Sequence, residues 1–497
     1  MKKILSKKQL SIFIALFISL LLVTGCSKDF LEQKPQGVLT EVEFLQTQQD
    51  AILATNAIYA SIREWNYYSG GYPILDIMSD DAVKGSNLGD GGALNLFNNF
   101  QFTATSGDIS RWYSALYKAV RRANIVIEKV PLITMDDALK TRLIAEAKFF
   151  RALAYFDLVR AFGDVPKITI ATPPNKIARS PKTEIYNEII IADLKAAIDI
   201  LPEKSAYKSA DMGRATKGAA KALLAKAYLY LGDFVNTEKY ALEVIGSTEY
   251  DLELDYSNAF SVQGQHGIES ILEIGALAKE DITIGGNQYA NTQGVRGVPN
   301  RGWGFNRPSV DLINSYEAGD IRKDSTIIFL GDILDGVLIE GDPATPDITY
   351  TDASQTVIKE IETYNQKVWV PGTTTATEWG FNTRIIRYAD VLLMAAEALN
   401  ENGDITQALY NLNLVRGRAG LTDYNSIDKV DIRTAIWKER RSEFAMEGQR
   451  YFDLVRTGQA AQVLGVYGFV SGKHELFPIP QSEIDLAEGT LTQNLNW

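Results

Sequence analysis

Cysteine and histidine are nearly absent from this 497-residue chain, which has one cysteine and two histidines. Because a disulfide needs two thiols, no disulfide can form within the chain. His266 and His474 lie far apart without the spacing of metal ligands, which makes a histidine-rich metal site and a Ser-His-Asp triad poor hypotheses. Acidic residues outnumber basic ones, and the formal net charge of −12 at pH 7 argues against nucleic acid or anionic lipid as a partner.

Long apolar runs are equally rare, and the one clear example, residues 11–23, lies near the N-terminus. Lysines precede it, and it runs into Val23-Thr24-Gly25-Cys26. A basic start, a short apolar stretch and small residues before a cysteine are the pattern of a bacterial lipoprotein signal. A transmembrane anchor is the alternative, but it would need about 20 apolar residues to cross the hydrocarbon core. We therefore predict that residues 1–25 are removed and that Cys26 carries the lipid.

Apolar residues recur with the period of an α-helix along much of the chain. Thr40 is predicted to cap the first helix, with Glu43 as its capping-box partner. A loop rich in glycine, asparagine and tyrosine is expected over residues 65–106. The predicted helices span residues 40–63, 109–129, 137–162, 182–201, 216–231, 234–245, 386–400 and 405–419.

Two of the predicted helix pairs share one design, with a tight turn at Gly232-Asp233 in one pair and at Gly403-Asp404 in the other. An alanine lies seven residues before each glycine, and larger side chains lie four before and two after it. Such spacing is typical of tetratricopeptide repeat (TPR) helix pairs, in which small residues let two helices approach closely. Ordinary helical hairpins are the alternative.

Residues 251–380 have a different character, because they are rich in glycine, asparagine, threonine and proline, with β-like runs at 268–274 and 357–361. The segment is too long for one structureless loop, so we predict a loop-rich, mixed subdomain inserted between helical parts. Loops on a rigid scaffold commonly carry binding residues. The predicted organisation is a signal peptide (1–25), a lipidated tether (26–40), a helical N-terminal region (41–250), the inserted binding region (251–380) and a C-terminal region (381–497).

The C-terminal third carries a series of distinctive motifs. Residues 387–394 read RYADVLLM, residues 438–444 read KERRSEF and residues 447–456 read EGQRYFDLVR. The series resembles the SusD/RagB family, and further segments that fit its pattern are residues 122–124, 146–152, 307–309, 319–322, 477–480, 483–484 and 493–494. The chain departs from the pattern only in its last loop, at residues 486–488 and 495–496.

The resemblance implies a mainly α-helical fold on four TPR-like units, with an irregular ligand-binding face. It implies an outer-membrane lipoprotein, exposed at the cell surface, that captures glycans. Its expected partner is a SusC-like TonB-dependent β-barrel transporter, over which it would sit as a lid. No enzymatic activity and no cofactor are expected.

Sugars present apolar C–H faces edged by hydroxyl groups, so a site for them needs aromatic rings with polar side chains at the rim. Residues 65–72 supply four aromatic residues and two glycines without helical or strand periodicity. Polar residues follow in the same loop, and the inserted segment adds further aromatic residues. For each aromatic residue the alternative is that it fills a gap in the core. The predicted glycan-binding residues are Trp65, Tyr67, Tyr68, Tyr72, Asp81, Asn87, Tyr289, Trp303 and Trp379.

Acidic side chains spaced four apart, Glu439, Glu443 and Glu447, alternate with arginines near the C-terminus. Paired carboxylates are the machinery of glycoside hydrolysis, and Asp80 with Asp81 is a second candidate pair. A surface glycoside hydrolase is therefore one alternative function. We favour a structural network in which arginine–carboxylate pairs tie helices together.

Two further alternatives concern partners. TPR units often bind proteins, so a protein- or peptide-binding adaptor of the outer membrane is possible, although it would not need an aromatic- and glycine-rich insertion. The acidic segment 332–352 is a candidate for Ca²⁺ by its composition, although its spacing does not match an EF-hand loop.

The lipoprotein signal gives a direct test. Mass spectrometry of the mature N-terminus is expected to find Cys26 as the first residue with its lipid attached, because acylation and cleavage occur together at such a motif. An intact Met1, or a cleaved end without lipid, would contradict the prediction.

Overall fold

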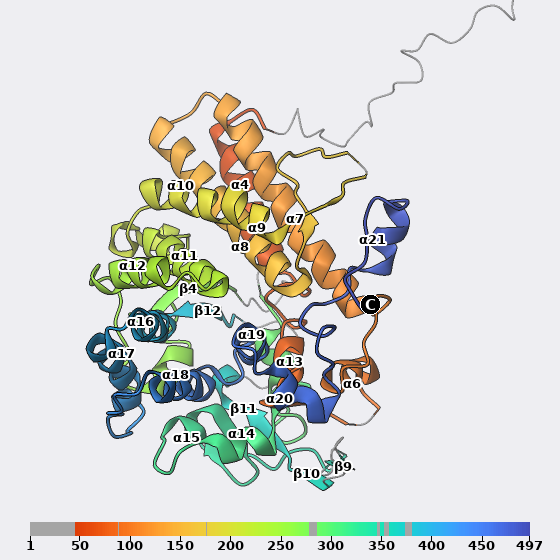
Figure 1. Ribbon diagram of the computed structural model, residues 1–497, viewed down its shortest axis with the longest axis vertical. Coiled ribbons are helices and arrows are strands. Elements are labelled where there is room, and N and C mark those ends of the chain that lie inside the picture. Colours follow the sequence, from red (N-terminus) through yellow and green to blue (C-terminus); the bar gives the residue numbers. More distant parts are fainter. Residues whose placement is uncertain are drawn as a thin grey trace, which may run out of the picture. The chain divides into compact units, whose positions relative to one another are not determined.

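The computed structural model describes residues 45–87, 89–174, 176–277, 286–344, 348–351, 357–372 and 380–497 (Figure 1). Residues 47–497 form one compact unit, and the description below concerns that unit. Cys26 and the predicted signal peptide lie outside the described residues. In the part of the chain that the structure describes, no helix combines the length and apolar character needed to cross a membrane.

Packed helices make up most of the chain from residue 48 to residue 245 (Figure 1). α7 packs against α4 and α8, and α10 packs against α8 and α11. A π-helical turn, Tyr186–Ile191, joins α9 to α10, so that residues 182–200 form one helical stretch as predicted. The bounds are α4 (Gln48–Ile62), α7 (Gly107–Lys129), α8 (Asp137–Phe162), α9 (Lys182–Ile185), α10 (Ala192–Ile200), α11 (Lys217–Leu231) and α12 (Phe234–Ile245).

The first described helix, α4, starts at Gln48, and Thr47 is its N-cap. Thr40 and Glu43, the predicted capping pair, lie outside the described residues. The Thr47 side chain accepts a hydrogen bond from the backbone of Asp50, and the Asp50 carboxylate accepts one from the backbone of Thr47 at 2.8 Å. This reciprocal pair satisfies amide donors that the first helical turn leaves without partners.

The two predicted TPR-like pairs are confirmed as matching hairpins. α11 turns into α12 at Gly232, and α16 (Tyr388–Asn402) turns into α17 (Ile405–Arg418) at Gly403; both glycines have positive φ. The following aspartate caps the second helix in each pair. α12 packs against α16, so the two hairpins stack as neighbouring repeats do. The helix predicted to begin at residue 386 begins at Tyr388, because the two preceding residues belong to a strand.

Strands occur as two-stranded antiparallel sheets, and the β-like runs predicted near residues 270 and 358 are confirmed. The predicted loop over residues 65–106 contains a strand and two short helices, α5 (Ile74–Ile77) and α6 (Asn95–Asn98). The paired strands are β1 (Ala82–Gly85) with β5 (Phe305–Pro308), β2 (Val165–Pro166) with β3 (Arg179–Ser180), β4 (Ser270–Ile274) with β12 (Thr383–Arg387), β6 (Ile327–Phe329) with β11 (Thr363–Asn365), β7 (Ile333–Leu334) with β8 (Val337–Leu338), and β9 (Ile348–Thr351) with β10 (Val357–Glu360).

The remaining α-helices lie in the loop-rich middle and the C-terminal part. They are α13 (Tyr289–Gln293), α14 (Val310–Ser315), α15 (Arg322–Thr326), α18 (Lys429–Phe444), α19 (Arg450–Arg456), α20 (Ala460–Leu464) and α21 (Gln481–Leu486). Among them, α18 contacts α16, α17 and α15, so it joins the helical hairpins to the loop-rich segment (Figure 1).

Buried ion pairs connect α18 to the elements packed around it. Glu443 of α18 is fully buried and pairs with Arg387 at 2.9 Å, Arg418 at 2.5 Å and Arg322 at 3.1 Å. Burial alone would raise the pKa of Glu443, but these guanidinium groups hold that pKa well below its usual range. Glu447 continues the network, since it pairs with Arg387 at 2.8 Å.

Glu439 completes the acidic row, because it pairs with Arg322 at 2.6 Å and with Arg416 at 3.1 Å. All three carboxylates therefore face arginines from other elements. These pairs confirm the structural interpretation of this charged helix.

The network predicts a large stability loss when its central charge is removed. Glu443→Gln leaves three buried guanidinium groups short of one counter-charge, so the free energy of unfolding is expected to fall by about 3–5 kcal/mol. Urea denaturation measures it. Lys176→Ala, which removes an exposed pair with Glu488, is the control and should cost less than about 1 kcal/mol. Equal effects of the two substitutions would contradict the role assigned to Glu443.

Candidate functional site

Trp65 and Trp303, two aromatic residues that the sequence nominates separately, lie together. Their ring centroids are 5.8 Å apart and the rings are inclined by 46°. Trp65 keeps 38% of its surface exposed, and Trp303 is half-buried. An inclined, partly exposed pair of indoles offers apolar faces to a ligand. We refer to Trp65 and Trp303 as the indole pair.

Glycine makes room for the indole pair. A Cβ atom at Gly70 would lie 2.1 Å from the Trp65 ring, so the ring rests directly on the backbone there. The main chain of Trp303 is also held, because its backbone N–H donates to the carbonyl oxygen of Asn291 in α13 at 2.9 Å. The sequence places glycine where the indole needs close approach to the main chain.

The loop that carries Trp65, residues 63–73 between α4 and α5, is anchored at several points, and we call it the Trp65 loop. The Gly71 N–H donates to the carbonyl oxygen of Trp65 at 2.9 Å, which closes the loop on itself. The Ser69 hydroxyl accepts from the N–H of Gln288, and the Thr383 hydroxyl donates to the carbonyl oxygen of Tyr68, both at 2.9 Å. The loop is therefore held by the inserted segment and by β12.

The tyrosines of this loop belong to the core, which corrects the prediction that they form the sugar platform. Tyr67 and Tyr68 are buried and stack on each other, and both hydroxyls donate to the Asp157 carboxylate, at 3.0 and 2.6 Å. Burial, reinforced by Asp157, raises the pKa of both tyrosines, so they stay protonated donors. Tyr72 and Tyr289 are buried as well. None of these rings leaves a face for a sugar.

Two predicted polar contacts also have structural partners. Asp81 is fully buried and pairs with Arg441 at 2.8 Å, so the prediction that it binds a ligand is wrong. The neighbouring Asp80 pairs with Arg450 at 2.8 Å. The Asn87 side-chain oxygen accepts from the N–H groups of Gly89 and Asp90, both at 3.0 Å, which shapes the loop. That oxygen is committed, and a ligand contact by Asn87 stays a prediction.

Some predictions fall outside the described residues. Trp379 is one of them, as are Asp347 and Asp352 of the acidic segment considered for Ca²⁺. The described aspartates of that segment serve the fold: Asp342 pairs with Arg296 at 2.5 Å, and Asp335 accepts from the Trp369 indole.

The structure adds a contact between Arg301 and Trp369 that the sequence did not predict. The Arg301 guanidinium lies 4.6 Å from the centre of the half-buried Trp369 ring, and it donates to the carbonyl oxygen of Val370 at 3.1 Å. Arg301 stands two residues before Trp303 in the same loop. Trp369 lies in an apolar run, Val368-Trp369-Val370, which predicts a core residue. Only the cation–π contact with Arg301 shows that its ring lies beside the loop that carries Trp303.

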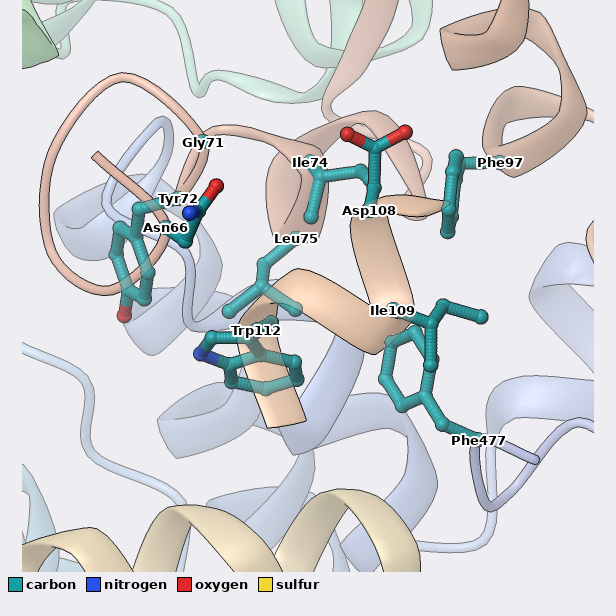
Figure 2. Close-up of a pocket in the computed structure, with 10 residues that line it drawn as sticks. All are labelled: Asn66, Gly71, Tyr72, Ile74, Leu75, Phe97, Asp108, Ile109, Trp112 and Phe477. Carbon is teal, nitrogen blue, oxygen red and sulfur yellow. The ribbon is translucent and has the colours of Figure 1, made fainter. Parts of the chain in front are cut away.

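A pocket behind the Trp65 loop is too small for a sugar. Figure 2 shows Asn66 and Tyr72 on one side of it, Asp108 and Phe97 on another, and Trp112 and Phe477 beyond Leu75. Its volume is about 20 Å³, room for one water molecule. Most of its walls are apolar core residues, so this pocket is part of the packing under the loop.

Asp76 secures the base of the loop. Its carboxylate is buried and accepts from the N–H of Gly448 at 2.7 Å and from the Asn306 amide at 3.1 Å. Burial is the main cause that raises the pKa of Asp76, to about 7. Gly448 directly follows Glu447, so Asp76 connects the Trp65 loop to the buried ionic network.

Comparison with known proteins gives consistent matches. A family model described as "SusD family" matches residues 268–497, and one described as "Starch-binding associating with outer membrane" matches residues 29–229. A SusD-like protein of Bacteroides ovatus is 30% identical, over 88% of this chain and 80% of that protein.

Comparison with solved structures indicates the same family. A laminarin binding SusD-like protein is 31% identical with a TM-score of 0.78, covering 91% of this chain and all of that one. Surface glycan-binding protein A from Bacteroides thetaiotaomicron, in complex with laminarihexaose, is 28% identical with a TM-score of 0.74, covering 90% of this chain and all of that one.

The raised pKa of Asp76 predicts a pH-dependent stability. Folded Asp76 binds its proton more tightly than unfolded Asp76, so its contribution is full below about pH 4 and is lost as the pH rises to about 7. Asp76→Asn cannot ionise. Between pH 5 and pH 7 the variant is therefore expected to gain about 2 kcal/mol in unfolding free energy relative to the unsubstituted chain. Denaturation at several pH values measures the difference, and a constant difference would refute the assignment.

Proposed function

The chain belongs to the SusD family, and we propose on that premise that it captures glycans at the cell surface, with the indole pair as its stacking platform. The observation that carries the proposal is the meeting of Trp65 and Trp303 on one partly exposed site. The family descriptions, which name starch binding and association with the outer membrane, support it.

The chemistry of the site favours a neutral glycan. Indole faces cover the apolar C–H face of a pyranose ring, and the half-buried Asn66 beside Trp65 offers an amide to hydroxyl groups. The net charge of −12 disfavours acidic glycans. Because two structural neighbours are described with laminarin or laminarihexaose, a laminarin-type glucan is the first ligand to test.

Delivery to a transporter is the second part of the proposal. A lipid on Cys26 would tether the protein to the outer membrane, and two acyl chains supply stable attachment where one does not. The family resemblance supports a SusC-like TonB-dependent barrel as the partner that receives the glycan. The protein would act as the capturing lid of that transporter.

We propose binding without hydrolysis. Retaining and inverting glycosidases both need two carboxyl groups on either side of the scissile bond. The carboxylates considered for this role, Asp80, Asp81 and Glu439, are buried and paired with arginines. Their partners fix them in the fold, away from an open cleft.

Trp65→Ala tests the platform. An aromatic side chain covers about 150–250 Å², and a sugar covers about a third of it, so at about 25 cal/mol/Å² the loss is on the order of 1–2 kcal/mol. Affinity for laminarihexaose is expected to fall about five- to thirtyfold by isothermal titration. Tyr410→Ala, an exposed aromatic residue on α17, is the control and should leave affinity unchanged.

The outcome also separates binding from folding. Unchanged affinity in Trp65→Ala would remove this residue from the site. A fall in affinity accompanied by a large drop in melting temperature would show that Trp65 acts mainly as a core residue.

A further inference from the structure

A larger cleft lies between the C-terminal half of α4, the segment around residue 212 and the end of β4. Its volume is about 200 Å³, against about 20 Å³ for the pocket behind the Trp65 loop, so it has room for a ligand much larger than one water molecule. Polar side chains dominate its walls, and none of them belongs to the indole pair. They are Asn56, Tyr59, Arg63, Asp211, Arg214 and His266.

His266 is held in one orientation at the wall of this cleft. Its ring Nδ1 lies 2.8 Å from Oε1 of the buried Glu273, and its Nε2 lies 3.2 Å from the Asn382 amide. Its backbone has a φ of +56°, an uncommon conformation for a residue with a side chain. A Cβ at Gly213 would lie 2.9 Å from the His266 ring, so only glycine fits opposite it. Strain of this kind persists when the surroundings fix it.

The facing wall is equally fixed. Arg214 donates to Asp211 at 2.6 Å, to Glu146 at 3.0 Å and to the Asn56 side-chain oxygen at 3.1 Å. The Tyr59 hydroxyl donates to Glu146 at 2.8 Å. Because the carboxylates offset the arginine charges, the cleft presents fixed donors and acceptors without a strong field of either sign. This suits a neutral ligand rich in hydroxyl groups better than an ion.

Short stretches of chain connect the cleft to the loop that carries Trp65. Arg63 lines it, and Trp65 follows two residues later, so their Cα atoms are at most about 7 Å apart. Asn382, which contacts His266, precedes Thr383, whose hydroxyl binds the backbone of the Trp65 loop at Tyr68. Short, hydrogen-bonded connections thus link the wall of the cleft to the loop of the platform.

We propose that this cleft is a second sugar subsite, which takes a neutral hexose unit of the same glycan that stacks on the indole pair. The inference rests on the proposed function and deepens it. Asn56 and Arg63 would contact hydroxyl groups of that unit, and His266, whose two ring nitrogens already have partners, would shape the wall beside it. A long oligosaccharide would then occupy both places, whereas a disaccharide would occupy the indole pair alone.

Filling the cleft tests the proposal. Ala210 is exposed and lines the cleft, so Ala210→Trp adds bulk there without removing a side-chain hydrogen bond. Its affinity for laminarihexaose is expected to fall about tenfold, while affinity for laminaribiose stays unchanged. Ser209→Trp is the matched control, because Ser209 is exposed beside Ala210 but does not line the cleft. Melting temperatures of both variants show whether the fold is kept.

The outcomes separate this inference from the proposed function. If Trp65→Ala weakens laminarihexaose binding and Ala210→Trp does not, the second subsite is refuted and the platform stands. Equal losses for the long and the short sugar in Ala210→Trp would also refute the subsite. If the unsubstituted chain binds no laminarihexaose, the glucan assignment and the subsite both fail.

Discussion

The buried pairing of Glu443 with three arginines is the interaction on which the arrangement of the chain depends. Arg387 ends β12, Arg418 ends α17 and Arg322 begins α15, so one carboxylate joins a strand, a TPR-like hairpin and the loop-rich segment. Desolvated charges are costly unless every partner is in place. The network therefore permits one relative placement of these elements, which hydrophobic packing alone specifies less strictly.

The Trp65 loop is connected to this network at two points. Glu447, paired with Arg387, is followed by Gly448, whose N–H binds Asp76 below the Trp65 loop. β12, which ends in Arg387, begins with Thr383, whose hydroxyl holds the same loop at Tyr68. A loop with little regular structure thereby presents Trp65 on a fixed base, so a ligand meets a platform that costs little entropy to order.

Local patterns in the sequence predicted what depends on near neighbours. The structure contains three features that these patterns predicted: the long helix α8, the glycine turns of the two hairpins, and the charged helix α18. The prediction that Tyr67 and Tyr68 bind a sugar is wrong, because their partner, Asp157, lies about 90 residues away on α8 and leaves no local signal in the sequence. The meeting of Trp65 with Trp303 and the cleft beside His266 likewise arise from tertiary contacts, which composition and spacing do not encode.

The central claim is that the indole pair is where a glycan binds. A crystal structure of the chain with laminarihexaose tests it most directly. We expect a pyranose ring stacked on Trp65 or Trp303, with its carbon atoms about 4 Å from the indole, the distance of an apolar contact. A structure in which the hexasaccharide binds elsewhere and both indole faces remain uncovered would contradict the claim.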